Sequence, residues 1–312
     1  MTLDVRAVRP PDAHDLEQAW RDVHSVLAPT PVLPSALAPD ALLKLETFQP
    51  TGSFKVRGAL AALAALPEGE RAVTASAGNH GLAMAYAASR VGADATVVVA
   101  ETASPAKIAK IQAYPVELVQ HGTLFDHAER HALSFQGHYV SPYNDPHVIA
   151  GQATIGRELD AQADGPLTVV AALGGGGLAS GLSLWARERG NVKVVAVESS
   201  ESRAVSAAVA AERIVAVEIG STIADGVTGN LEPGSVTPAL LSGHAELTAV
   251  TDAEIHAAMR WLFTEHGLVV EGAGACGVAA VLAGKVQIEG RLVVVLSGRN
   301  ITVQNYTEAL NS

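Results

Sequence analysis

Short apolar runs alternate with amphipathic helical segments through the middle of the chain. Between residues 71 and 140 this pattern predicts four strands separated by three helices. The strands are expected at 72–76, 95–100, 116–119 and 139–140, and the helices at 79–91, from Ser104 onward and at 124–135. Such alternation is typical of an open α/β sheet.

A second alternating series lies on both sides of the first. A helix at 14–27, a strand at 41–47 and a helix at 54–66 precede it, and strands at 167–173, 192–197, 246–250 and 292–296 follow a turn-rich connection. A capping box beginning at Thr251 opens a further helix, which Gly267 ends. The pattern predicts a large unit of residues 1–70 and 145–312, with a small α/β unit of residues 71–144 inserted into it.

Composition and charge narrow the class of protein. Hydrophobic residues make up 48% of the 312 residues and charged residues 17%, as in folded globular proteins. The formal net charge of −11 argues against a nucleic-acid partner. The single cysteine, Cys276, excludes an internal disulfide and any multi-cysteine metal site, and we expect it in the core. We also expect no membrane span and a cytoplasmic location, because no apolar run is long enough and residues 1–13 lack a secretion signal.

A lone lysine stands among small and apolar residues in the stretch Ser53-Phe54-Lys55-Val56-Arg57-Gly58. The predicted helix places Lys55 in its first turn, where the helix dipole favours the neutral amine over the cation. A lysine with a lowered pKa can attack a carbonyl carbon. Most lysines at a helix start are solvated surface charges, and taken alone this stretch favours that interpretation.

Four consecutive glycines follow the apolar strand at 167–173 and open a helix at 179–186. In Gly174-Gly175-Gly176-Gly177-Leu178 the backbone N–H groups can converge on one point, and the helix dipole adds to them, so a phosphate is the favoured ligand. The spacing departs from G-x-G-x-x-G, which argues against a dinucleotide. Tight packing is the alternative explanation for the glycines.

Two more polar segments lie where strands end. Ser76-Ala77-Gly78-Asn79-His80-Gly81 fits a carboxylate-sized anion, but an ordinary N-cap with a solvent-exposed His80 is favoured when the segment is taken alone. Ser297 follows the last strand, at the edge where α/β folds bind ligands, and offers a neutral hydrogen-bond partner.

Together these segments indicate a ligand with a phosphate, an aldehyde-reactive position and a ring atom that needs a neutral partner, which describes pyridoxal phosphate. The chain resembles the serine/threonine dehydratase and serine racemase family of fold-type II pyridoxal-phosphate enzymes. The segments named above carry the resemblance, and Val148 to Gln152, Thr222 to Gly226 and Glu271 to Gly274 extend it. It implies a tryptophan-synthase β-like α/β fold with two open sheets.

The resemblance also implies roles for individual residues. Lys55 would bind the cofactor as a Schiff base and then act as the base at the substrate Cα. Phe54 would pack near the cofactor ring, Asn79 would hydrogen-bond its phenolic oxygen, and Ser297 would face its pyridine nitrogen. The phosphate would be bound by the glycine-rich turn, namely Gly174, Gly175, Gly176, Gly177 and Leu178. The substrate carboxylate would be bound by Ser76, Gly78, Asn79 and His80.

The implied reaction is β-elimination of L-threonine or L-serine to a 2-oxo acid and ammonia. Family racemases place a second serine where this chain has Ala77, which predicts little racemisation. Dehydration of 3-hydroxyaspartate or an aryl-serine, amino-acid racemisation, β-replacement and non-catalytic cofactor binding are the alternatives. Residues 122–125, which we expect beside the substrate side chain, are apolar apart from Thr123 and favour a small uncharged substrate.

Other features of the family are absent or altered. Glu198 matches one ligand of the divalent-cation site of some relatives, but Ala204 replaces the second, so we expect no metal. Arg299 stands where relatives commonly have glycine, and it either closes the site or is solvated. We expect no regulatory domain after Ser312. The resemblance implies a homodimer or homotetramer.

Overall fold

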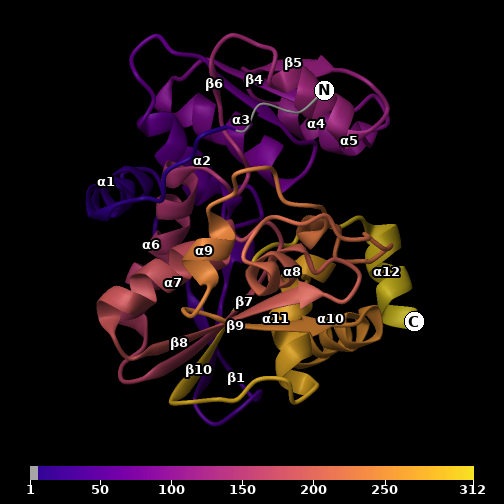
Figure 1. The fold of residues 1–312 in the computed structure, drawn as a ribbon. Coiled ribbons are helices and arrows are strands. Elements are labelled where there is room, and N and C mark those ends of the chain that lie inside the picture. The colour runs from indigo at the N-terminus through magenta and orange to yellow at the C-terminus, as the bar shows by residue number, and fades with distance from the viewer. Residues whose placement is uncertain (1–5) are drawn as a thin grey trace.

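The chain folds into two sheets in the computed structural model, which describes residues 6–312 (Figure 1). The larger sheet has the strand order β1-β2-β10-β7-β8-β9. Its strands are β1 Val32–Ser35, β2 Ala41–Lys44, β7 Leu167–Ala172, β8 Val192–Ser199, β9 Glu246–Val250 and β10 Arg291–Val295. β1 pairs antiparallel with β2, and the other neighbouring pairs are parallel.

The smaller sheet is parallel throughout and has the order β5-β4-β3-β6. Its strands are β3 Ala72–Ala75, β4 Ala95–Val99, β5 Glu117–Gln120 and β6 His138–Tyr139. Two open α/β sheets are therefore confirmed, and the smaller one interrupts the chain between β2 and β7. The unit boundaries at residues 70 and 145 stay a prediction, and residues 1–5 of the larger unit lie outside the described residues.

Helices cover both sheets. They are α1 Ala13–His24, α2 Lys55–Ala64, α3 Asn79–Val91, α4 Pro105–Gln112, α5 Phe125–Ala132, α6 Pro146–Gln162, α7 Gly177–Arg189, α8 Ala204–Ala211, α9 Thr237–Leu241, α10 Asp252–His266, α11 Gly272–Leu282 and α12 Val303–Asn311. In Figure 1, α3, α4 and α5 lie with the smaller sheet above the larger one. Within residues 6–312, no helix combines the length and the apolar character that a membrane crossing requires.

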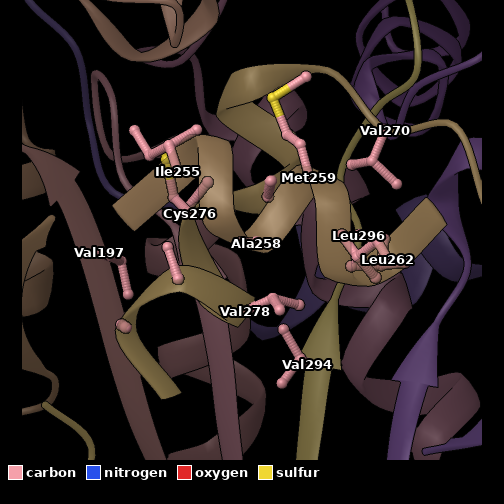
Figure 2. Packing of buried hydrophobic residues seen from close by; sticks show 14 of the residues in the cluster. Val197, Ile255, Ala258, Met259, Leu262, Val270, Cys276, Val278, Val294 and Leu296 are labelled. Atoms are coloured by element: carbon pink, nitrogen blue, oxygen red, sulfur yellow. The ribbon is translucent and has the colours of Figure 1, made fainter. Parts of the chain in front are cut away.

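The core of the larger sheet follows from the alternation of side chains along its strands. In β7, Val170 and Ala172 belong to the cluster with α10 and α11, whereas Val169 and Ala171 belong to the cluster with α6 and α7. Figure 2 shows the first of these clusters. Cys276 is buried there, as predicted, and burial raises the pKa of its thiol to about 12.

Several expected bounds of the elements differ from those in the structure. The strand expected at 41–47 ends at Lys44, and Glu46–Phe48 form a short 3-10 helix instead. Helix α1 ends at His24 rather than at residue 27. The polar side chains of Lys44 and Glu46, which lie within the expected strand, are both buried in a cluster of charges.

That cluster consists of two cations and two carboxylates with fully buried side chains, namely Lys44, Glu46, Arg57 and Glu158. Arg57 Nε donates to Glu46 Oε2 at 2.7 Å, and Arg57 Nη1 donates to Glu158 Oε1 at 2.6 Å. Lys44 Nζ donates to the other oxygen of Glu158. Since Arg57 lies in the first turn of α2, the cluster ties the start of this helix to β2 and α6.

Candidate active site

A cavity of about 1600 Å³ is lined by residues from both sheets. All the site residues predicted from the sequence line it, namely Phe54, Lys55, Ser76, Gly78, Asn79, His80, Gly174, Gly175, Gly176, Gly177, Leu178 and Ser297. They come from the start of α2, the β3–α3 turn, the β7–α7 turn and the segment after β10. These turns follow the carboxyl ends of parallel strands, where open α/β sheets bind ligands.

Lys55 is the first residue of α2, and its side chain is partly exposed to the cavity. Its Nζ donates a hydrogen bond to the backbone oxygen of Pro142 at 2.7 Å and lies 5.2 Å from the centre of the Phe54 ring. Burial lowers the pKa of Lys55 to about 8, although Glu271 favours the cation. Lys55 is therefore not an ordinary solvated surface charge, and part of the amine is neutral near neutral pH.

The β7–α7 turn has no room for side chains. A Cβ on Gly175 would lie 2.3 Å from Tyr143 Cγ, and one on Gly174 would lie 2.9 Å from Val227 Cα. Gly176 has a φ of +97°, which also favours glycine. The turn leads into the 13-residue helix α7, whose free N–H groups point toward its start. This glycine cradle lines the cavity beside the free N–H groups of the helix start, and it fits a phosphate.

The β3–α3 turn is not an ordinary helix start. The Ser76 hydroxyl accepts a hydrogen bond from the Gly78 N–H at 3.1 Å, but the Asn79 side chain does not cap the helix. His80 is buried rather than solvent-exposed, and its Nε2 donates to the Val140 oxygen at 3.2 Å. Burial and the nearby Lys55 lower the pKa of His80 to about 3, so its imidazole is neutral and Nδ1 carries no proton.

Glu271 is a cavity residue to which sequence reasoning gave no role. It precedes α11, is only 6% exposed, and its Oε1 accepts a hydrogen bond from Asn79 Nδ2 at 2.7 Å. Burial raises the pKa of Glu271 to about 7, although the hydrogen bond from Asn79 opposes the shift. Asn300 also contacts Asn79, since its Nδ2 donates to Asn79 Oδ1 at 2.7 Å.

The remaining predicted residues are placed as follows. Ser297 is buried, and its backbone oxygen accepts a hydrogen bond from the Phe54 N–H at 3.0 Å. Ala77 and Phe125 line the cavity, but Thr123 does not. Arg299 is exposed, and its side chain forms no ion pair with any residue in 6–312.

Glu198 lies outside the cavity lining and acts as a cap for α8. Its Oε1 accepts hydrogen bonds from the backbone N–H groups of Val205 and Ser206, at 3.0 Å and 3.2 Å. Its other oxygen accepts from the Ser206 hydroxyl. The Glu198 carboxylate, which the family resemblance suggested as a metal ligand, thus accepts hydrogen bonds from the N-terminus of α8 instead.

The fold and the cavity define an α/β enzyme of the kind that binds a phosphate-bearing cofactor beside a lysine. The chain belongs to the family of pyridoxal-phosphate-dependent enzymes, whose family model matches residues 23–298. The predicted cofactor and the predicted fold-type II family are thereby confirmed.

Three known proteins illustrate this similarity. The chain is 38% identical to an L-threonine ammonia-lyase of Thermotoga maritima, over 95% of this chain and 77% of that protein. The solved structure of the processed form of threonine deaminase isoform 2 from Solanum lycopersicum is 28% identical and matches 99% of this chain and 96% of its own, with a TM-score of 0.88. A maize serine racemase structure is 25% identical and matches 97% of this chain and 98% of its own, with a TM-score of 0.87.

Proposed function

We propose that this protein is an ammonia-lyase that converts L-threonine or L-serine to a 2-oxo acid and ammonia. The observation that carries the proposal is the convergence on one cavity of Lys55, with its lowered pKa, and the glycine cradle at the start of α7. The name of the Thermotoga maritima relative supports the same activity. In the net reaction the β-hydroxyl leaves as water, and hydrolysis of the resulting enamine releases ammonia.

Bound pyridoxal phosphate would supply the electron sink that makes the substrate Cα proton acidic. The backbone N–H groups of the cradle, Gly174 to Gly177, would bind its phosphate, and the Ser297 hydroxyl would meet its ring nitrogen as a neutral partner. Lys55 Nζ would remove the Cα proton, for which a pKa of about 8 is well matched to neutral pH.

The β3–α3 turn would bind the substrate carboxylate through the Ser76 hydroxyl and through backbone N–H groups. His80 would contribute its backbone N–H, because its Nε2 proton is used by Val140 and its Nδ1 has no proton to donate. Asn79 would present a side-chain donor to the phenolic oxygen of the cofactor.

The activity is tested by incubating the purified holoprotein with L-threonine, L-serine, 3-hydroxyaspartate or an aryl-serine, with no added thiol, and measuring ammonia and 2-oxo acid. We expect turnover of the two small substrates, and Lys55→Ala is the inactive control. A protein that binds pyridoxal phosphate but releases no ammonia would support the non-catalytic alternative.

Racemisation is the second candidate, since a maize serine racemase shares the fold. Ala77 argues against it, because the methyl group that lines the cavity at this position cannot donate a proton to Cα. We expect the unmodified protein to form almost no D-serine from L-serine, and Ala77→Ser to form measurably more in a chiral chromatography assay. Substantial D-serine from the unmodified protein would refute this prediction.

Four further points stay predictions beyond the activity. The apolar Phe125 beside the cavity favours a small uncharged substrate over hydroxyaspartate. The Schiff base at Lys55 is checked by the visible absorbance of the purified protein, and the homodimer or homotetramer by light scattering. A cytoplasmic location is the fourth prediction, and cell fractionation checks it.

A further inference from the structure

The side chain of Asn79 is held by residues from the opposite sheet. Asn79 opens α3, on the side of the smaller sheet, whereas Glu271 precedes α11 and Asn300 follows β10. Asn79 Nδ2 donates to Glu271 Oε1, and Asn79 Oδ1 accepts from Asn300 Nδ2, both at 2.7 Å. Both ends of the Asn79 amide therefore have a partner of the matching kind.

These partners permit only one orientation of the amide. If the amide were flipped, Asn79 Oδ1 would face the carboxyl group of Glu271 and Asn79 Nδ2 would face Asn300 Nδ2. Asn300 cannot turn to compensate, because its second Nδ2 hydrogen is donated to the Thr51 oxygen at 2.8 Å. The Asn79 side chain has two hydrogens on Nδ2. One is donated to Glu271, so the other is left for a ligand in the cavity.

The surrounding backbone leaves the two partners little freedom. A Cβ on Gly298 would lie 2.1 Å from Glu271 Oε1, and a Cβ on Gly52 would lie 2.9 Å from Asn300 Oδ1. The Glu271 N–H also donates to the Gly298 oxygen at 3.1 Å. The carboxyl group and the amide are thus packed tightly against glycines, as expected of groups whose positions matter.

We propose that Glu271 and Asn300 are positioning residues that fix the Asn79 amide so that it presents a hydrogen-bond donor to the phenolic oxygen of pyridoxal phosphate. This inference rests on the proposed function, since it takes Asn79 as the partner of that oxygen. Neither positioning residue needs to touch the cofactor, because each acts through Asn79. The pKa of Glu271, raised to about 7 by burial, is consistent with a carboxyl group held out of water.

The test is a double-mutant cycle on cofactor affinity. Apoprotein is titrated with pyridoxal phosphate, and the Kd is measured for the unmodified protein, Glu271→Leu, Asn79→Ala and the double variant. We expect Glu271→Leu to weaken binding about ten-fold, as for loss of one buried hydrogen bond. In the Asn79→Ala background the same change should weaken binding less than about two-fold, because the group that Glu271 positions is gone. Loss of the Glu271 charge also leaves more of the Lys55 amine neutral, which does not weaken attachment of the cofactor.

A change in visible absorbance of the bound cofactor should accompany the loss of affinity in Glu271→Leu, and the absorbance of the double variant should match that of Asn79→Ala. The matched control is Glu198→Gln, a buried glutamate that caps α8 outside the cavity lining, and its Kd should be unchanged. If Glu271→Leu does not fold, Asn300→Ala replaces it in the cycle, because it removes the other partner of Asn79.

The inference is overturned if the Glu271 or Asn300 change weakens binding equally with and without Asn79. That result would leave the proposed function intact. Failure of the proposed function looks different, because the unmodified protein would then fail to bind pyridoxal phosphate or to release ammonia.

Discussion

Lys55 shows at the scale of one residue how burial creates reactivity. Its pKa is lowered to about 8 by loss of water around the amine. Only the neutral amine attacks a carbonyl, so the rate at which apoprotein attaches pyridoxal phosphate should rise with pH and level off above about pH 8. Stopped-flow absorbance on mixing apoprotein with the cofactor measures this rate. An unchanged profile in Lys55→Ala would show that another group is responsible.

The cavity residues differ in how much of their role the sequence reveals. Lys55, the glycine cradle and Ser297 follow strands or open helices, and local pattern alone places them at one edge of a sheet. Glu271 gives no such signal, because a glutamate before a helix is usually a favourable N-terminal charge. Its partner Asn79 is 192 residues away in the sequence, so only the folded chain shows their hydrogen bond.

For His80 the sequence did give an expectation, and the structure contradicts it. The sequence favours a solvent-exposed side chain when the turn is taken alone, yet the structure buries it with a hydrogen bond to Val140. The residue type does not reveal whether a histidine side chain in a turn faces the solvent or the protein interior. Burial here is set by the packing of β3 against the segment after β6, which is a tertiary contact.

The start of α2 depends on the buried charge cluster of Lys44, Glu46, Arg57 and Glu158. Removing Arg57 would leave two buried carboxylates with Lys44 as the remaining cation, so Arg57→Met should lower the free energy of unfolding by about 3–5 kcal/mol. Urea unfolding followed by circular dichroism measures this loss. Arg71→Met, which breaks the exposed pairs with Asp94 and Glu117, is the control and should cost far less.

The same cluster makes the free energy of unfolding depend on pH, and the sign of this dependence can be derived. Burial raises the pKa of Glu46, but Arg57 and Lys44 outweigh this effect and leave it below the ordinary value of 4.5. The carboxylate therefore stabilises the folded state above the unfolded-state pKa, and this contribution is lost as the pH falls through the folded-state value. Arg57→Met should flatten the decline of stability in acid, and an equally steep decline would contradict this account.

Among the elements, some were predicted closely and others had no predicted counterpart. The strands at 95–100 and 292–296 and the helix at 79–91 match β4, β10 and α3 closely. Helix α6 had no predicted counterpart, because Val148 to Gly156 are all buried and leave no polar face to mark a helical period. β1 had none either, since Pro34 argues against a strand except at a sheet edge, which is where β1 lies.

At the scale of the whole molecule, the two sheets are joined beside the cavity. One buried cluster includes Val23 of α1, Leu60 of α2 and Val148 of α6, together with Met84 of α3 and Ala72 of β3. α2 and α3 carry Lys55 and Asn79 at their starts, so this packing sets the distance between the residue expected to attach the cofactor and the turn expected to bind the substrate. A cofactor in the cavity would add contacts to both sheets at once.

We therefore expect pyridoxal phosphate to stabilise the entire chain. At a concentration of 100 Kd, a ligand that binds only the folded state adds about 2.7 kcal/mol, which should raise the melting temperature of the apoprotein by about 5 °C. Hydrogen exchange should slow both at the β3–α3 turn and at the β7–α7 turn, because the ligand would contact the two together. Differential scanning fluorimetry and exchange mass spectrometry measure these effects.

Pyridoxal without its phosphate is the matched control for this experiment. It retains the aldehyde that would react with Lys55 but lacks the phosphate that the cradle at Gly174 to Gly177 is expected to bind. Its effect on the melting temperature should therefore be much smaller, and exchange at the β7–α7 turn should stay fast. Equal stabilisation by the two compounds would mean that the glycines serve only close packing, against Tyr143 and Val227, and that the phosphate is bound elsewhere.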